Sequence, residues 1–197
     1  MVTVGFIVEG DTEKILIESK QFRGWCNRIG IRVLRPVINA KGGGNLLPKY
    51  LDNYIICLSS KETPDKIVVL TDLEEEPSVE LVQRRVLASH VCERIDVVFV
   101  AVKSLEAWFL ADDLAMTRWL GLSKRFHEAN PEQTPKTPWD RLRTIAKSLG
   151  KRGPGHKLRF VRRMLRFGFS IEEAARHPNC ASVRHFCEML QEWGEKR

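Results

Sequence analysis

Acidic side chains follow three of the four apolar, β-branched runs in this sequence. Glu9 directly follows the first run, Asp72 and Glu74 follow the third, and Glu106 comes shortly after the fourth. If the runs are parallel strands, their carboxyl ends share one edge of a sheet, and the acids converge there. Like charges at close range are costly unless a cation neutralises them or their pKa values rise. Because oxygen ligands suit Mg²⁺ or Mn²⁺, the sequence predicts a metal site built from these four residues.

Each acid also has a purely structural interpretation. Glu9 could be the polar end of a strand, and Glu106 could be an acid in the first turn of a helix. Asp11 suits a helix cap, while Glu75 and Glu76 suit a solvated loop. The recurrence of acids at strand ends favours the metal site for Glu9, Asp72 and Glu74 together.

The elements that would position these acids alternate along the first part of the chain. Strands are expected at 2–8, 31–38, 66–71 and 96–102, with helices at 11–30, 46–59 and 79–94 between them. This order, with strands apolar on both faces, predicts an α/β fold: a parallel sheet covered by helices on both sides. Beyond it, helices are expected at 104–120, 138–150, 155–168, 170–176 and 182–194. We therefore expect an α/β domain over 1–115 and a basic helical C-terminal region over 116–197, packed on it.

Charge is distributed unevenly between these two parts. Residues 1–115 carry 14 Lys/Arg and 17 Asp/Glu, whereas residues 116–197 carry 18 and 8, so the net charge of +7 comes from the second part. Such a basic region favours a polyanionic partner, with DNA or RNA first, although a solvated face is the alternative. A stripe of arginines spaced i, i+3, i+4 and i+7 could track a phosphate backbone. The predicted nucleic-acid-binding residues are Arg159, Arg162, Arg163, Arg166, Lys151 and Arg152.

Other functional classes lack their motifs. The chain has no G-x-x-x-x-G-K-[ST] loop, no G-x-G-x-x-G after the first strand and no G-x-S-x-G. The glycines at 42–44 could cradle a phosphate or simply form a flexible turn. Five scattered cysteines without a C-x-x-C pair favour reduced thiols and a cytoplasmic location. Zinc binding by His177, Cys180, His185 and Cys187 is disfavoured by their spacing. No apolar run is long enough to cross a membrane, and no secretory signal is expected.

The acidic motifs resemble those of the Toprim domain, the catalytic module of topoisomerases, bacterial primases and overcoming-lysogenization-defect (OLD) nucleases. The matching segments are Phe6-Ile-Val-Glu-Gly-Asp-Thr-Glu13 and Leu70-Thr-Asp-Leu-Glu74, in which Glu74 stands where the family usually has aspartate. Ser104-Leu-Glu-Ala-Trp-Phe-Leu-Ala-Asp112 and the basic tail resemble more closely a family of uncharacterised bacterial Toprim-like proteins. This resemblance extends over nearly the whole chain.

The resemblance implies a Toprim-like, Rossmann-like sheet in which Glu9 is a general acid/base or metal ligand, while Asp72 and Glu74 hold Mg²⁺. It implies a Mg²⁺- or Mn²⁺-dependent nuclease, with a role in defence against mobile elements as an attractive extension. The alternatives are a non-catalytic nucleic-acid-binding module and primase-like nucleotidyl transfer. Strand passage is disfavoured because Tyr50 and Tyr54, the only tyrosines, lie in one expected helix. A partner protein or a homodimer is left open.

Overall fold

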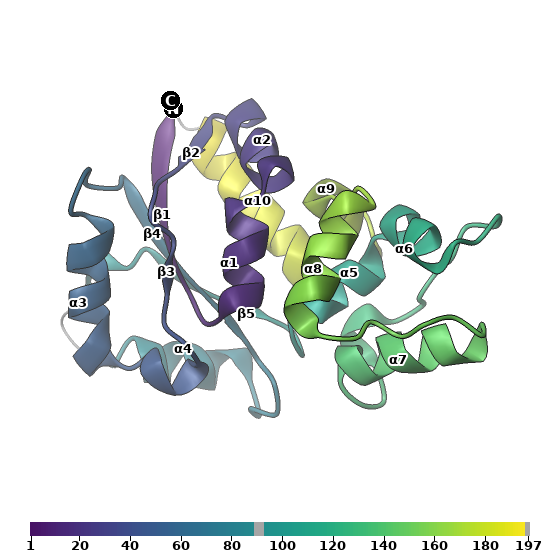
Figure 1. Ribbon diagram of the computed structural model, residues 1–197. Helices are drawn as coiled ribbons and strands as arrows, with labels where there is room; N and C mark the ends of the chain where they lie inside the picture. Colours follow the sequence, from purple (N-terminus) through teal and green to yellow (C-terminus); the bar gives the residue numbers. More distant parts are fainter. Residues whose placement is uncertain (89–92, 196–197) are drawn as a thin grey trace.

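The structure, a computed structural model, describes residues 1–88 and 93–195 and has a five-stranded sheet flanked by helices (Figure 1). The strands are β1 (Val2–Val8), β2 (Ile31–Val33), β3 (Ile38–Asn39), β4 (Lys66–Asp72) and β5 (Val97–Ala101). The α-helices in these ranges are α1 (Asp11–Glu18), α2 (Lys20–Arg28), α3 (Pro48–Leu58), α4 (Val79–Val86), α5 (Glu106–Ala111), α6 (Asp113–Leu120), α7 (Pro138–Ser148), α8 (Lys157–Arg166), α9 (Ile171–Ala175) and α10 (Ala181–Glu195). The 3₁₀ turns are η1 (Gly43–Asn45) and η3 (Pro131–Gln133).

All strand pairs in the sheet are parallel, in the order β2-β1-β4-β5, and β3 also pairs with β1. Strands β1 and β4 are therefore neighbours, although more than fifty residues separate them in the sequence. Their carboxyl ends, and that of β5, lie at one edge of the sheet. The predicted parallel α/β fold is confirmed.

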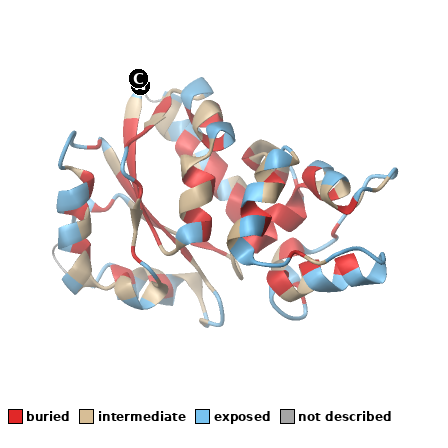
Figure 2. Cartoon of the chain, viewed as in Figure 1, coloured by how far each residue is buried: buried red, intermediate tan, exposed pale blue. Residues whose placement is uncertain are grey.

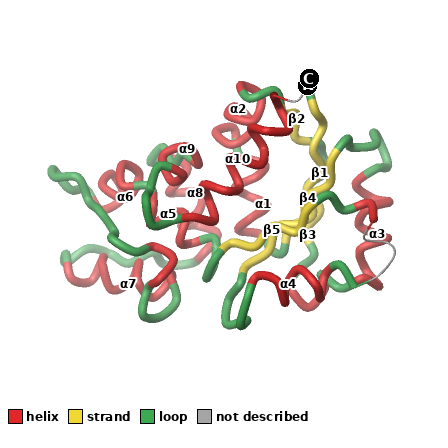
Figure 3. Tube along the Cα trace, turned by 180° about the vertical axis from the view of Figure 1, so that it is seen from behind, coloured by secondary structure: helices red, strands yellow, loops and turns green. Residues whose placement is uncertain are grey.

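Each face of the sheet has its own hydrophobic core (Figure 2). Ile7 and Val69 belong to the smaller core, which α3 and α4 cover, whereas Phe6 and Val68 point into the larger one. This alternation is the two-residue period of a strand that is buried on both faces. The larger core continues from the sheet into the helices of the C-terminal region. Figure 3 shows these helices beside the sheet. The division of the chain at residue 115 stays a prediction.

Helix α10 returns from the C-terminal region to the sheet and packs on β5 and β2. Phe186 of this helix makes edge contacts with Phe6 and Phe99, with ring centroids 6.3 Å and 4.9 Å away. It also packs against Trp108 of α5 at 5.3 Å, and the Trp108 indole donates a hydrogen bond to the Ser182 hydroxyl at 2.8 Å. Aromatic packing of this kind fixes the end of the chain on the same core that supports the strand ends.

Three predicted elements are broken where the sequence pattern suggests continuity. The expected helix at 11–30 is two helices, because the Ser19 side chain accepts a hydrogen bond from Phe22 N and caps α2. The expected helix at 104–120 divides at Asp112, which caps α6 in the same way by accepting from Ala115 N. The expected strand at 31–38 is two short strands, with Pro36, which has no N–H for the ladder, between them.

Apart from the helix expected at 79–94, the remaining elements agree with the structure to within a few residues. Helix α4 ends at Val86, and residues 89–92 of the helix expected at 79–94 lie outside the described residues. The four helices expected after residue 137 are α7 to α10. Within the described ranges, none of the helices combines the length and apolar character needed to span a bilayer.

Two helical glycines, one in α10 and one in α2, test how closely α10 packs against the end of α2. A Cβ at Gly194 would lie 1.7 Å from the Ile29 carbonyl oxygen, whereas a Cβ at Gly24 would meet no atom within 4 Å. We expect Gly194→Ala to lower the free energy of unfolding by about 1–3 kcal/mol through overpacking. Gly24→Ala in α2 should instead raise it by about 0.5–1 kcal/mol. Urea denaturation checks both, and an unaffected Gly194→Ala variant would contradict the packing of α10.

Candidate active site at the carboxyl edge of the sheet

Glu9, at the end of β1, is held by the neighbouring strand. Its Oε2 accepts hydrogen bonds from the Thr71 hydroxyl and from Asp72 N, the latter at 3.1 Å. The glycine loop that follows β3 lies against it, since a Cβ at Gly43 would be 3.3 Å from Glu9 Oε1. The N–H of Gly42 donates to the Glu9 carbonyl oxygen at 2.8 Å. Backbone and side-chain donors therefore fix the Glu9 carboxylate at this edge.

Asp72 and Glu106 join the same edge from β4 and α5. Asp72 is half-buried, and its Oδ1 accepts from Leu105 N at 2.9 Å, one residue before α5 begins. The Glu106 side chain is 2% exposed, and its Oε1 lies 3.2 Å from Lys157 Nζ at the start of α8. The structure thus brings Glu106 beside Asp72, as the sequence predicted for a residue that follows the fourth strand.

Glu13 is a fourth carboxylate at this site. It lies in the first turn of α1, is 5% exposed, and its Oε2 accepts from Gly10 N at 2.9 Å. The sequence analysis included Glu13 in a matching segment but did not predict it as a site residue. The signal that could have identified it is its place in the segment Phe6–Glu13, which carries the resemblance at the end of the first strand.

Burial and the neighbouring negative charges raise the pKa values of Glu13 and Asp72. Burial raises the pKa of Glu13 to about 7, with further increases from the charges of Glu106 and Glu9. Burial also raises the pKa of Asp72 well above its usual range, and the charges of Glu13, Glu106 and Glu9 add to this. The hydrogen bond from Leu105 N opposes that shift only in part. These four carboxylates therefore interact as one group, which we call the acidic group.

Lys157 supplies a positive charge to the acidic group. Burial lowers its pKa, but the charges of Glu106, Asp72 and Glu13 outweigh burial, so that the pKa is raised. The Lys157 ammonium also lies 5.8 Å from the centroid of the Trp139 ring. Sequence reasoning placed Lys157 in the basic helix but assigned it no role, because no local pattern links it to Glu106.

Glu74 occupies the rim rather than the centre of the site. Its backbone is left-handed, with φ of 50°, and its N–H donates to the Lys103 carbonyl oxygen at 2.7 Å. The side chain is exposed and lines the same open cavity of about 810 Å³ as Asp72 and Glu106. The charges that raise the pKa of Asp72 come from other acids. The sequence placed Glu74 beside Asp72 as an equal ligand; the structure brings it to the cavity wall.

The predicted nucleic-acid-binding arginines gather beside α8. Arg152, Arg159, Arg162, Arg163 and Arg166 line one cavity of about 500 Å³, together with Gly155 and His156. Lys151 is exposed at the end of α7 and is not part of that lining. Arg163 is half-buried and donates to the Pro154 carbonyl oxygen at 2.8 Å, so it also secures the loop before α8.

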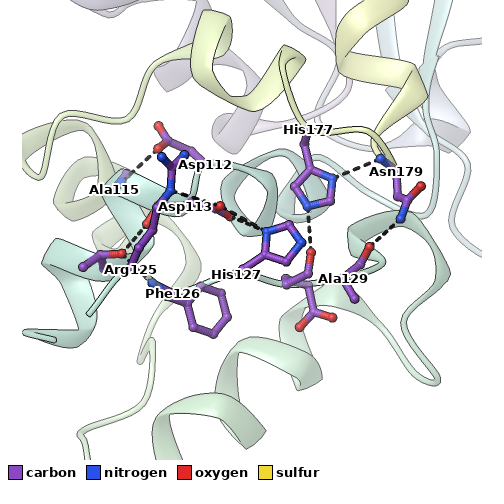
Figure 4. Close-up of polar contacts among 11 residues, drawn as sticks. Asp112, Asp113, Ala115, Arg125, Phe126, His127, Ala129, His177 and Asn179 are labelled. Carbon is purple, nitrogen blue, oxygen red and sulfur yellow. Dashed lines mark hydrogen bonds and ion pairs between the residues drawn. The ribbon is translucent and has the colours of Figure 1, made fainter. Parts of the chain in front are cut away.

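A second polar cluster lies in the C-terminal region (Figure 4). In the described part of the chain, Asp113, His127 and His177 are the group of three whose metal-ligand atoms all lie within 4.8 Å of one another. However, His177 Nε2 lies 2.7 Å from the Glu128 carbonyl oxygen, and His177 Nδ1 accepts from Asn179 N at 3.1 Å. Both ring nitrogens are therefore engaged within the protein, which leaves no lone pair for a metal.

The acidic group is more widely spaced than that cluster, since no three of its ligand atoms meet the same distance limit among the described residues. Mg²⁺ is usually held by one or two carboxylates, with water and substrate phosphate oxygens completing its shell. Asp72 and Glu106 of the acidic group line the open cavity together with Glu74, and carboxylates placed in this way fit that mode of binding. Cys180 and Cys187 are buried, and their thiols face the Glu132 carboxylate and the Ile171 carbonyl oxygen, as expected for structural thiols.

Two solved structures are similar to this chain, both C-terminal regions of OLD proteins. The Burkholderia pseudomallei protein is 19% identical, with a TM-score of 0.49, over 98% of this chain and 98% of that one. The Xanthomonas campestris pv. campestris protein is 20% identical, with a TM-score of 0.47, over 98% of this chain and 95% of that one. OLD proteins are among those that the sequence motifs resemble. No protein-family profile and no curated protein matches the chain.

The raised pKa of Glu13 predicts how the stability of the metal-free protein depends on pH. A proton binds Glu13 more tightly in the folded state, with a pKa of about 7, than at its usual 4.5. The free energy of unfolding should therefore fall as pH rises from about 4.5 to about 7. Glu13→Gln keeps an acceptor for Gly10 N and should remove up to about 3 kcal/mol of that fall.

Urea denaturation with chelator at pH 5 and pH 8 measures the difference between the wild type and Glu13→Gln. Asp72 should leave a residual fall of the same sign in the variant, because its pKa is also raised. If the free energy of unfolding depends on pH identically in the two proteins, the pKa of Glu13 is not raised in the folded state.

Proposed function

We propose that this protein is a metal-dependent phosphodiester hydrolase that acts on nucleic acid. The observation that carries the proposal is the acidic group, which four separate parts of the fold hold at the carboxyl edge of a parallel sheet. Strained, perturbed carboxylates of this kind are typical of catalytic sites. A structural role alone would not require burial and neighbouring charges to raise the pKa values of Glu13 and Asp72 beside an open cavity.

The donor set fits Mg²⁺ or Mn²⁺. Glu9, Asp72 and Glu106 present carboxylate oxygens, the ligands that these ions prefer, and Glu74 offers another at the rim. When bound, the metal would neutralise charge on the scissile phosphate and lower the pKa of a water molecule. The metal would also relieve the repulsion within the acidic group.

The chain's own residues would orient the reactants. Glu9, fixed by Thr71 and Asp72 N, would hold the metal or exchange a proton with the attacking water or the leaving oxygen. Lys157, at the same wall, would hold its positive charge near a bound phosphate. Asp72 is positioned by Leu105 N and so stays oriented when its protonation changes.

Helix α8 supports nucleic acid as the polyanion. It begins with Lys157, which contacts the acidic group, and its four arginines line the cavity of about 500 Å³ that His156 also lines. The side chains of Arg159, Arg162 and Arg166 form no hydrogen bond or ion pair with any described residue. Their guanidinium groups are therefore available to phosphates. The Toprim-like motifs support the same function, and that resemblance extends the proposal to defence against mobile elements.

Cleavage of DNA and RNA oligonucleotides with and without Mn²⁺ tests the proposal. We expect metal-dependent cleavage that Glu9→Gln reduces by about 10²–10⁴-fold, the usual effect of losing a general acid or base, with binding retained. Glu18→Gln, the same change on α1 at a residue that pairs with Lys14, is the control and should remain active. Binding without cleavage by the wild type would instead favour a non-catalytic nucleic-acid-binding module.

Thermal denaturation separates loss of metal binding from loss of chemistry. Mn²⁺ at ~100 times its dissociation constant should stabilise the wild type by about 2.7 kcal/mol. Asp72→Asn should lose most of this response, whereas its metal-free form should be at least as stable as the wild type. No response of the wild type at millimolar Mn²⁺ would rule out the metal site.

The salt dependence of binding tests the arginines of α8. Each lost phosphate contact should reduce the slope of log affinity against log salt by about 0.7–0.9. Arg163 donates a hydrogen bond to the Pro154 carbonyl oxygen, so its replacement could also disturb the loop. The better pair to replace by Gln is Arg159 and Arg162, which are both exposed. The double variant should flatten the slope by about 1.5. An equivalent change of Lys61 and Arg84, exposed near α3 and α4, should leave it unchanged. Equal slopes in the wild type and both double variants would show that the arginines of α8 face solvent and do not contact phosphates.

A further inference from the structure

The cavity beside the acidic group is also lined by basic side chains. The acids that line it are Asp72, Glu74, Glu75, Glu106 and Asp140, and the cations are Lys103, Lys136, Arg143 and Lys157. Lys136 comes from the loop before α7 and Arg143 from α7 itself, a part of the basic region in which the sequence analysis predicted no individual site residue. One cavity therefore combines the groups that would hold a metal with groups that would hold an anion.

Trp139 fixes the positions of two of these cations. Its ring is 8% exposed and packs edge-on against buried Phe160, with centroids 5.5 Å apart and an interplanar angle of 85°. The Arg143 guanidinium carbon lies 5.7 Å from the ring centroid, and Lys157 Nζ lies 5.8 Å from it. An indole anchored in the core thus supports both side chains by cation–π contact.

The two cations differ in their other partners. Lys157 forms an ion pair with buried Glu106, with Nζ 3.2 Å from Oε1. Among the described residues, Arg143 forms an ion pair only with Asp140, at 3.3 Å, in an exposed i,i+3 contact of the kind that contributes little. A guanidinium group has five N–H donors, so most of those of Arg143 remain available to a ligand.

The loop that carries Lys136 is tied to the strand ends that carry the acids. Lys103, just after β5, donates through Nζ to the Thr134 carbonyl oxygen at 3.1 Å, and its own carbonyl oxygen accepts from Glu74 N. The Thr134 hydroxyl donates to the Lys136 carbonyl oxygen at 2.7 Å. These contacts hold the basic residues at a set distance from the acidic group.

We propose that Arg143, with Lys136, binds a second phosphate of the polynucleotide, next to the phosphodiester placed at the acidic group. The inference rests on the proposed function. The planar fork of an arginine matches two phosphate oxygens, and each such charge-assisted pair is stronger than a neutral hydrogen bond. The subsite would make the enzyme select a chain with neighbouring phosphates over a compound with a single phosphodiester. Trp139 is then a positioning residue for this subsite.

The test compares an oligonucleotide with bis(4-nitrophenyl) phosphate, which has one phosphodiester and no neighbouring phosphate. In Arg143→Gln, the ratio of kcat/KM for the oligonucleotide to that for the small diester should fall about tenfold, mainly through a higher KM. Arg143→Lys should recover part of the loss because it keeps the charge. Lys147→Gln, exposed one turn further along α7 and outside the cavity lining, is the matched control. That control should not change the ratio.

Binding measured by fluorescence anisotropy separates this proposal from the proposed function. With Ca²⁺ present, Arg143→Gln should weaken oligonucleotide binding about tenfold, and Lys147→Gln should not. If the wild type binds the oligonucleotide but cleaves neither substrate, the proposed hydrolase activity is wrong. The subsite is then still supported if Arg143→Gln binds the oligonucleotide more weakly than the wild type. An unchanged affinity and kcat/KM ratio in Arg143→Gln, or an equal loss on both substrates, would overturn the subsite. So would failure of the wild type to bind the oligonucleotide.

Discussion

Repulsion among carboxylates at one edge of the sheet is the constraint on which the rest of the structure depends. Glu9, Glu13 and Asp72 are each held by a backbone N–H, from Asp72, Gly10 and Leu105 respectively. These donors orient the acids without neutralising them, so the pKa values of Glu13 and Asp72 stay raised. Stability lost at such a place must be recovered elsewhere, and the continuous core between sheet and helices is where that recovery occurs.

The C-terminal region completes the site as well as supporting it. Lys157 of α8 reaches Glu106, while α10 returns to the sheet and buries Phe186 against Phe6 and Phe99. Helix α8 also packs against α1, which carries Glu13. The basic helix and the acidic strand ends therefore share neighbours, so a polyanion on α8 would lie against elements that position the acids.

Local patterns in the sequence were sufficient for the long central strands but not for the helix boundaries or for the break between β2 and β3. Strands β1 and β4 were predictable because burial on both faces produces continuous β-branched runs. The breaks at Ser19 and Asp112 were not, since apolar residues continue at helical spacing on both sides of each. A polar residue in such a series can be exposed or can cap a new helix, and only the hydrogen bonds to Phe22 N and Ala115 N decide between these.

The same limit explains which parts of the site the sequence revealed. Glu9, Asp72 and Glu106 were found because parallel topology sends strand ends to one edge, whatever their separation in sequence. Lys157 was not, because a helix from another part of the chain brings it to Glu106, fifty-one residues away in the sequence. Its single charge cannot balance four carboxylates, so protons or a metal ion must supply the rest. Charge that the fold itself leaves unbalanced is therefore the physical basis of the divalent cation affinity that we propose for this site.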